Sequence, residues 1–220
     1  MAVLFNQHWD VATDQMQPYS EDFVMGTYNP TLARLGLELV GGYYVTVGMG
    51  PRIILCARTQ TMSMLEAAIT SAEFEAVTRQ LMQYVTGYHS KILVPTHRVA
   101  MEHYEVQSGM CKYTQYWNVV PGREREYIEF MEREFVPGME AAGAPLAGGW
   151  RVVVGSGPQI LTESATPTIV DIARALESEP FRQVIRTLKT TYVTDYHSRI
   201  LHPTGRVELP LFLKEMLGSF

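Results

Sequence analysis

One stretch of this 220-residue chain occurs twice, and that duplication constrains the fold more than any other feature. Residues 84–99 and 192–207 share the pattern Tyr-Val-Thr-x-Tyr-His-Ser-basic-Ile-Leu-x-Pro-Thr-x-Arg-Val. An earlier Gly-Gly stretch, residues 41–53, also returns as residues 148–160. The two stretches recur at spacings of 108 and 107 residues, and similarity at a nearly constant spacing indicates a repeated structural unit. The sequence therefore predicts two copies of one module. Their expected bounds are 1–108 and 109–220.

Each copy is expected to open with a strand and a helix. The strand alternates apolar and polar side chains, as a half-buried strand does. In the second copy Pro121-Gly122 opens the helix, whose apolar residues fall close to a 3.6-residue spacing. Proline removes a helical hydrogen bond and clashes with the preceding turn. Pro30 and Pro137 should therefore kink or split the two helices. The two opening strands are expected at 4–11 and 113–120.

A hairpin, a second helix and a last strand are expected to complete each copy. A Gly-x-Gly-Pro turn joins the two hairpin strands. The repeated Tyr-His-Ser segment forms the last strand. The order β-α-β-β-α-β is that of the ferredoxin-like module. The hairpins are expected at 42–57 and 149–164, and the second helices at 62–82 and 168–190.

Such a module leaves one face of its sheet uncovered. Both helices lie on one side of the sheet, and the apolar and aromatic groups of the other side need a partner. Because the two copies are fused, each is held close to the other at high effective concentration. The sequence predicts an α+β fold in which the two sheets face each other as an intramolecular barrel. Residues 97–112 would connect the copies, and residues 209–220 would add a terminal helix.

The motifs of the second copy resemble those of a NIPSNAP-type module. The resemblance rests on a Pro-Gly helix start, a mid-helix proline, a Gly-Gly hairpin and two later motifs. These motifs are Pro121-Gly122, Phe135-Val136-Pro137, Gly148-Gly149-Trp150, Glu179-Pro180-Phe181 and Ser198-Arg199-Ile200-Leu201-His202-Pro203. The first copy departs from the pattern, with Asp14-Gln15 in place of Pro-Gly and Ala72-Glu73 in place of Glu-Pro.

The resemblance implies membership of the dimeric α+β barrel group, which includes the antibiotic-biosynthesis monooxygenases. Relatives implied by it include cofactor-independent oxygenases, haem-degrading enzymes, isomerases and proteins without known activity. No catalytic motif shared by NIPSNAP-type modules is carried over to particular residues of this chain.

A Tyr-His pair recurs in both last strands, as Tyr88-His89 and Tyr196-His197. A histidine facing an enclosed apolar interior can act as a general base near neutral pH. A tyrosine can hydrogen-bond an oxyanion. Neighbours on a strand point to opposite faces, so only one member of each pair can face the interior of a regular strand. His89, His197 and Tyr196 are the candidate catalytic residues, and the alternative is that all of them are structural.

The two opening strands each offer a polar and an aromatic face. Either face could line the space between the sheets, and the other would then pack under the helices. From these faces and the repeated segment come the candidate ligand-binding residues His8, Tyr116, Trp9, Trp117 and Tyr88. A polar floor with His8 and Tyr116 would suit a small oxygenated or aromatic ligand.

Several classes of protein are disfavoured by composition and spacing. The net charge of −5 is unlike that of a nucleic-acid binder, and no run of 18 apolar residues predicts a membrane span. The two cysteines and the absence of a targeting pattern favour a reducing, cytoplasmic setting. No metal site is predicted, because no His-x-His, His-Glu-x-x-His or Cys-x-x-Cys spacing occurs. No cofactor is predicted either, although haem held by one histidine leaves no spacing signature and stays open.

The leading hypothesis is an enzyme that acts on a small apolar or aromatic molecule between the sheets. Cofactor-independent oxygenation or an isomerase-type proton transfer would be its chemistry. His89 or His197 would be the base, and Tyr116, Tyr196 or His8 would orient the substrate. The alternative is a non-enzymatic module that binds a ligand, haem or a protein. Substrate, pathway and oligomeric state, including a homo-oligomer of the fused unit, are left open.

Overall fold

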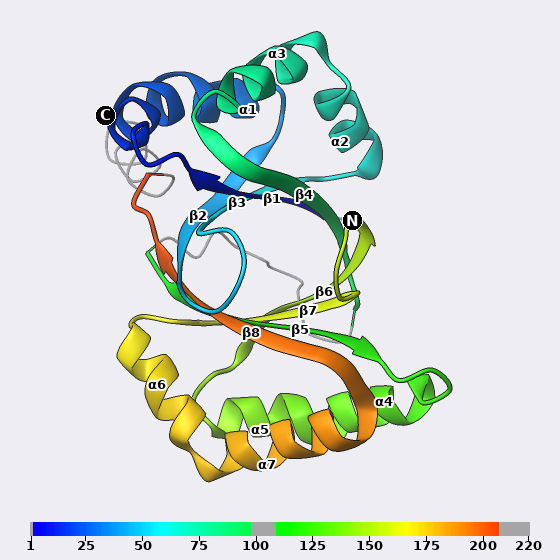
Figure 1. Ribbon diagram of the computed structural model, residues 1–220. Helices are drawn as coiled ribbons and strands as arrows, with labels where there is room; N and C mark the ends of the chain where they lie inside the picture. The colour runs from blue at the N-terminus through cyan, green and yellow to red at the C-terminus, as the bar shows by residue number, and fades with distance from the viewer. Residues whose placement is uncertain (1, 98–108, 207–220) are drawn as a thin grey trace, which may run out of the picture.

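The computed structural model closes the chain into one eight-stranded antiparallel barrel, with helices outside each half (Figure 1). It describes residues 2–97 and 109–206. The first half contributes β1 (Val3–Val11), β2 (Glu38–Val47), β3 (Ile53–Thr59) and β4 (Val85–Pro95). The second half contributes β5 (Cys111–Val119), β6 (Leu146–Val154), β7 (Ile160–Thr166) and β8 (Val193–Pro203). The strand order around the barrel is β1-β3-β2-β8-β5-β7-β6-β4.

Two seams join the halves, one between β2 and β8 and one between β4 and β6. In the first seam Tyr44 is opposite His202, and in the second Leu93 is opposite Val152. Moving four strands around the barrel takes β1 to β5, β3 to β7, β2 to β6 and β8 to β4. Neighbouring strands alternate in direction, so four steps preserve it. Equivalent residues of the two halves therefore lie at similar heights, and those that point inward face each other across the interior.

The first helix of each half continues through its proline with a local change of period. In the second half α4 (Glu124–Phe130), the π-helical η2 (Met131–Phe135) and α5 (Val136–Ala141) follow without a gap. The Val136 N–H donates to Met131 O, five residues back, just before Pro137, which has no N–H. In the first half η1 (Pro18–Tyr28) runs into α1 (Asn29–Arg34) in the same way. The wider turn accommodates the proline, so the expected kink or split takes the form of a π-helical segment.

The second helix of each half is broken where the sequence analysis expected continuity. The pieces are α2 (Met62–Ile69) and α3 (Ala72–Leu81), and α6 (Ile169–Glu177), α7 (Glu179–Thr187) and the π-helical η3 (Leu188–Tyr192). Ser71 and Ser178 begin the later pieces, and their hydroxyls accept hydrogen bonds from Phe74 N–H and Phe181 N–H. A side-chain cap starts a new helix. The expected single helices were wrong because these caps were not recognised.

Strand alternation divides the core into three clusters. Two lie between a sheet and its helices, around Trp9 in the first half and Trp117 in the second. The third fills the barrel interior and includes Tyr43, Tyr116 and Trp150. The predicted α+β fold, two ferredoxin-like modules forming one barrel, is confirmed. The expected terminal helix lies outside the described residues, as does most of the expected connection.

None of the described helices is long and apolar enough to cross a membrane.

Candidate functional site

The polar face of each opening strand lies inside the barrel. On β1, Asn6 and His8 point to the interior and are 4% and 2% exposed, while Phe5 and Trp9 pack under the helices. On β5, Thr114 and Tyr116 are the interior counterparts. The choice that the sequence left open between the two faces is therefore settled in favour of the polar one.

His8 and Tyr116 each lie opposite a histidine on the neighbouring last strand. His8 is opposite His89 in the β1–β4 register, and the two rings stack with centroids 4.7 Å apart and an interplanar angle of 3°. Tyr116 is opposite His197, and their rings stack at 4.8 Å and 13°. The pseudo-twofold relation between the halves brings these two stacks to the same level of the barrel. Lys91, which follows His89 on β4, lies 5.6 Å from the Tyr116 ring centroid, so the two stacks are treated as one histidine cluster of His8, Tyr116, His89 and His197.

A β-bulge in each last strand fixes which nitrogen of the cluster histidines carries a proton. Gly87 and Asp195 adopt left-handed backbone conformations with φ of 64° and 53°, and the strand register shifts there. Their carbonyl oxygens accept hydrogen bonds from Nδ1 of His89 and His197, each at 3.2 Å. A carbonyl can only accept, so Nδ1 must be the protonated nitrogen. Nε2 of each neutral ring then keeps its lone pair for accepting a proton.

The three histidines differ in their access to solvent. His8 is buried, His89 is half-buried and His197 is exposed. Burial, followed by the charges of His89, Arg199 and Lys91, holds the pKa of His8 well below its ordinary value. Burial also lowers the pKa of His197; the hydrogen bond to the Asp195 carbonyl opposes this shift, and the charges of Arg199 and Lys91 add to it. Neutral imidazole is the form that can act as a base.

Two basic residues complete the cluster, and the sequence analysis missed both as site residues. Lys91 Nζ and the Arg199 guanidinium carbon lie 5.6 Å and 5.3 Å from the centroid of the Tyr116 ring. They occupy equivalent positions two residues after His89 and His197. The recurrence of a basic residue at this place in both copies was the signal that could have identified them, because side chains two apart on a strand share a face.

The rest of the interior is mainly apolar, with one buried ion pair. Leu4, Ile54, Leu93, Leu161 and Leu201 belong to this cluster. Lys112 Nζ lies 3.4 Å from both carboxylate oxygens of Glu163, and the Trp150 indole N–H donates to the same carboxylate at 3.3 Å. The interior thus combines a large apolar lining with the histidine and basic cluster.

Four candidate residues are not in the interior but under the helices. Trp9, Trp117, Tyr88 and Tyr196 belong to, or pack against, the two helix-side clusters. The hydroxyls of Tyr88 and Tyr196 donate to Gln7 and Gln115 at 3.0 Å and 2.9 Å. Burial raises the pKa of Tyr88 to about 12 and also raises that of Tyr196. The structure does not bring these four side chains together with His89 and His197.

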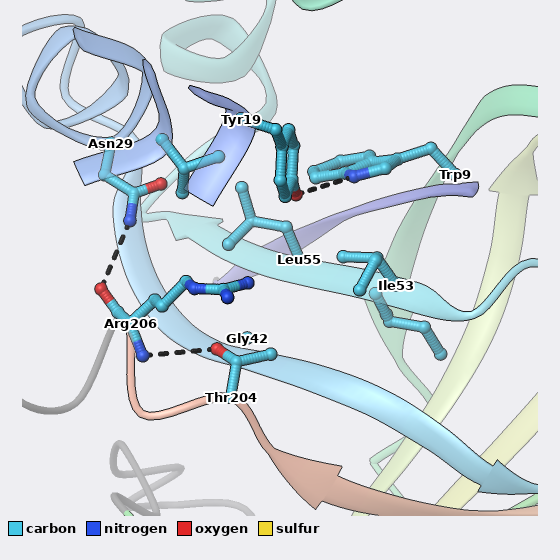
Figure 2. A pocket seen from close by; sticks show the side chains of 10 residues that line it. Trp9, Tyr19, Asn29, Gly42, Ile53, Leu55, Thr204 and Arg206 are labelled. Carbon is cyan, nitrogen blue, oxygen red and sulfur yellow. Dashed lines mark hydrogen bonds between the residues drawn. The ribbon is translucent and has the colours of Figure 1, made fainter. Parts of the chain in front are cut away.

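The space around Trp9 is too small for a substrate. Its indole N–H donates to the Tyr19 hydroxyl at 2.8 Å beside a cavity of about 20 Å³ (Figure 2). Asn29 and Arg206 form the polar side of this cavity, and Asn29 Nδ2 donates to the Arg206 carbonyl at 3.4 Å. A volume of this size accommodates a single water molecule. The position of Trp9 therefore indicates a packing role.

The described cavities offer no histidine to a haem. The cavity beside Trp9 has none in its lining, and neither does a groove of about 390 Å³ along α7 and η3. Within residues 2–97 and 109–206, no three His, Cys, Asp or Glu side chains come together as a metal site would need. Haem ligation therefore gains no support from this geometry.

No protein-family model and no curated protein sequence matches the chain. Several solved structures do. A protein provisionally assigned as a monooxygenase from Lactobacillus acidophilus matches with a TM-score of 0.60 and 10% identity, over 92% of this chain and 93% of that one. A mutant chlorite dismutase from Candidatus Nitrospira defluvii matches with a TM-score of 0.61 and 10% identity, over 95% and 94%. A haem-binding protein from Thermus thermophilus matches with a TM-score of 0.58 and 11% identity, over 96% and 94%.

A NIPSNAP-like domain protein from Burkholderia xenovorans also matches, over 44% of this chain and 88% of that one. Its identity is 19%, and its TM-score of 0.36 is too low to support an argument. At identities near 10%, the full-length matches establish a shared fold and leave the activity undecided. The chain has the dimeric α+β barrel fold, with both halves of the barrel supplied by one polypeptide.

Proposed function

We propose that the chain binds a small apolar or aromatic molecule in the barrel and removes a proton from it. His197 and His89 are the bases, and His8 and Tyr116 are the rings against which the bound molecule is oriented. One observation carries this proposal: both bulges leave Nε2 of a neutral histidine as a proton acceptor beside the barrel interior. Proteins of this fold include one that is provisionally assigned as a monooxygenase and one that binds haem, which supports a small molecule as the ligand.

The proposed step is the removal of a proton from a carbon acid. The proton moves to Nε2 of His197 or His89, and the electron pair of the broken C–H bond stays on the substrate as an enolate. The imidazolium is stabilised through Nδ1 by the Asp195 or Gly87 carbonyl. An isomerase would return the proton to another atom of the substrate. A cofactor-independent oxygenase would pass the carbanion to molecular oxygen, so both reactions begin with the same step.

Hydrogen–deuterium exchange of 2-tetralone tests this step, since this apolar aromatic ketone has acidic C–H bonds. Proton NMR in D₂O follows the loss of the C–H signal with and without the protein. The wild-type chain is expected to accelerate exchange, and the double variant His89→Ala/His197→Ala to lose about 100-fold of that acceleration, the lower end for a general base. His202→Ala is the matched control, because His202 is an exposed histidine on the same strand.

A folded double variant with wild-type exchange rates would remove both histidines from the reaction. Loss of acceleration in the His202→Ala control would point instead to a general effect on the barrel. If the wild-type chain accelerates exchange, oxygen consumption during the same reaction separates an oxygenase from an isomerase.

A further inference from the structure

We infer that Lys91 and Arg199 form an oxyanion-binding site, so the molecule taken up by the barrel is an aromatic or apolar acid. This inference deepens the proposed function and rests on it for the location of the substrate. It adds a chemical class: one carboxylate or other singly charged oxygen group attached to an apolar body. The cations hold the charged oxygen, and the apolar body of the molecule packs beside them.

The two cations lie near the same aromatic ring. Each lies within 6 Å of the centre of the Tyr116 ring, although they come from different halves of the chain. Each is also seated against a glycine turn of the opposite half. A Cβ added at Gly50 would lie 2.6 Å from an Arg199 guanidinium nitrogen, and one at Gly157 would lie 3.3 Å from Lys91 Nζ. The two turns thus leave room for the charged ends of Arg199 and Lys91.

Neither cation is neutralised by the rest of the described chain. Lys91 is 8% exposed. Within residues 2–97 and 109–206, its ammonium group forms no ion pair and no hydrogen bond. Arg199 forms no salt bridge within those ranges either, and its Nε is buried without a hydrogen-bond partner. Glu163, the buried acid of the interior, is already engaged by Lys112 and Trp150. Buried charges are normally paired, which makes an anionic ligand the missing partner.

Other polar atoms around the cations also lack partners. Both ring nitrogens of His8 are buried and make no hydrogen bond, and the same is true of the Thr114 hydroxyl. The proximity of Lys91 and Arg199, together with burial, lowers the pKa of Lys91. An oxyanion would relieve this repulsion and accept hydrogen bonds from both cations. The leucines of the interior and Trp150 form a buried apolar cluster.

Benzoate and benzamide are the probes, because they have the same shape and differ in charge. Isothermal titration calorimetry of the full-length chain is expected to show benzoate binding at least about tenfold more tightly than benzamide. Acetate, which has the charge without the ring, is expected to bind more weakly than benzoate. Lys91→Gln and Arg199→Gln should each weaken benzoate binding about tenfold, as expected when a charge-assisted hydrogen bond is lost.

The repeat supplies matched controls that keep the charge. Lys91→Arg and Arg199→Lys each introduce the residue that the other half carries at the equivalent position, and both should bind benzoate within about threefold of wild type. Arg151→Gln removes an exposed charge from β6 and should leave binding unchanged. These variants also distinguish loss of the site from loss of the fold.

Equal binding of benzoate and benzamide, or no benzoate binding at millimolar concentrations, would overturn the inference. Folded glutamine variants that bind benzoate like wild type would do so as well. In each case the proton-transfer proposal still holds if the double variant His89→Ala/His197→Ala no longer accelerates hydrogen–deuterium exchange of 2-tetralone. Conversely, charge-dependent benzoate binding with unaltered exchange in that double variant would retain the oxyanion site and reject the proposed base.

Discussion

The residues of the barrel interior combine an apolar lining with groups that water would normally solvate. His8 is the clearest example, because its ring is 2% exposed and stacked on His89. Alternation along β1 predicts that His8 shares a face with Asn6 and not with Trp9. Alternation alone does not say which face is inside, because both faces carry bulky groups. That choice is made by the helices, which cover the Trp9 face in the folded chain.

The burial of His8 predicts a loss of stability in mild acid. Its pKa lies well below the ordinary value of 6.5, so below pH 6.5 the unfolded chain binds a proton that the folded chain does not. Stability therefore falls as the pH drops below 6.5 and is unaffected by this group above it. Urea unfolding at pH 7.0 and pH 5.5 measures the difference.

The variant His8→Tyr should show a smaller loss of stability between these two pH values. It introduces the residue found at the equivalent position 116, which stacks on His197 in the same way. His202→Tyr, at an exposed position, should keep the wild-type pH dependence. An unchanged pH dependence in His8→Tyr would show that acid sensitivity arises elsewhere.

Among the elements, the helices differ most from what the sequence suggests. Apolar spacing places them correctly along the chain, but it does not reveal the break before α3 or before α7. Pro180, at the second position of α7, and the serine caps were available signals. The bulges are harder to predict. A glycine at position 87 is consistent with a left-handed backbone conformation. Asp195 adopts the same conformation, and its carboxylate accepts a hydrogen bond from Asn118 Nδ2 at 2.8 Å.

The crossing of α5 and α7 depends on the small size of Gly138. A Cβ added there would collide with Val184 Cγ1. Gly138→Ala is therefore expected to lower the free energy of unfolding by about 1–3 kcal/mol, the usual cost of overpacking. Chemical denaturation monitored by circular dichroism measures it.

Gly26→Ala provides the comparison, because nothing lies within 4 Å of a Cβ added at that position in η1. Its effect should stay within about 0.5 kcal/mol, as for substitutions that create no clash. Equal effects of the two alanine substitutions would contradict the assignment of Gly138 to a tight helix crossing.

For the whole molecule, the internal repeat made the architecture predictable. It identifies two ferredoxin-like sheets whose bare faces need covering, and covering them within one chain leads to the barrel. The pairing of β2 with β8 and of β4 with β6 was not predictable from the repeat, because sheets can also face each other without sharing edges. The repeat marks Lys91 and Arg199 as equivalent residues, but the closeness of Lys91, in the first half, to Tyr116, in the second, depends on those seams.

The seams predict that the two halves unfold together. Trp9 reports on the first half and Trp117 on the second. In the variants Trp117→Phe/Trp150→Phe and Trp9→Phe/Trp150→Phe, the fluorescence and circular dichroism transitions in urea should coincide, as two-state unfolding requires. Adding Gly138→Ala, a change in the second half, should lower the midpoint reported by Trp9.

If adding Gly138→Ala does not change the urea midpoint reported by Trp9 fluorescence, the two halves are energetically independent. Two separate transitions in either single-tryptophan variant would lead to the same conclusion.

Fusion of the halves also frees them from having to be identical. In an assembly of two separate copies, every substitution near the axis appears on both sides. Here Tyr116 occupies the position equivalent to His8, and Arg199 the position equivalent to Lys91, so the opposing walls have diverged independently. A bound molecule therefore contacts one wall from the first half and a chemically different wall from the second. A single mutation can improve its fit to one wall without changing the other.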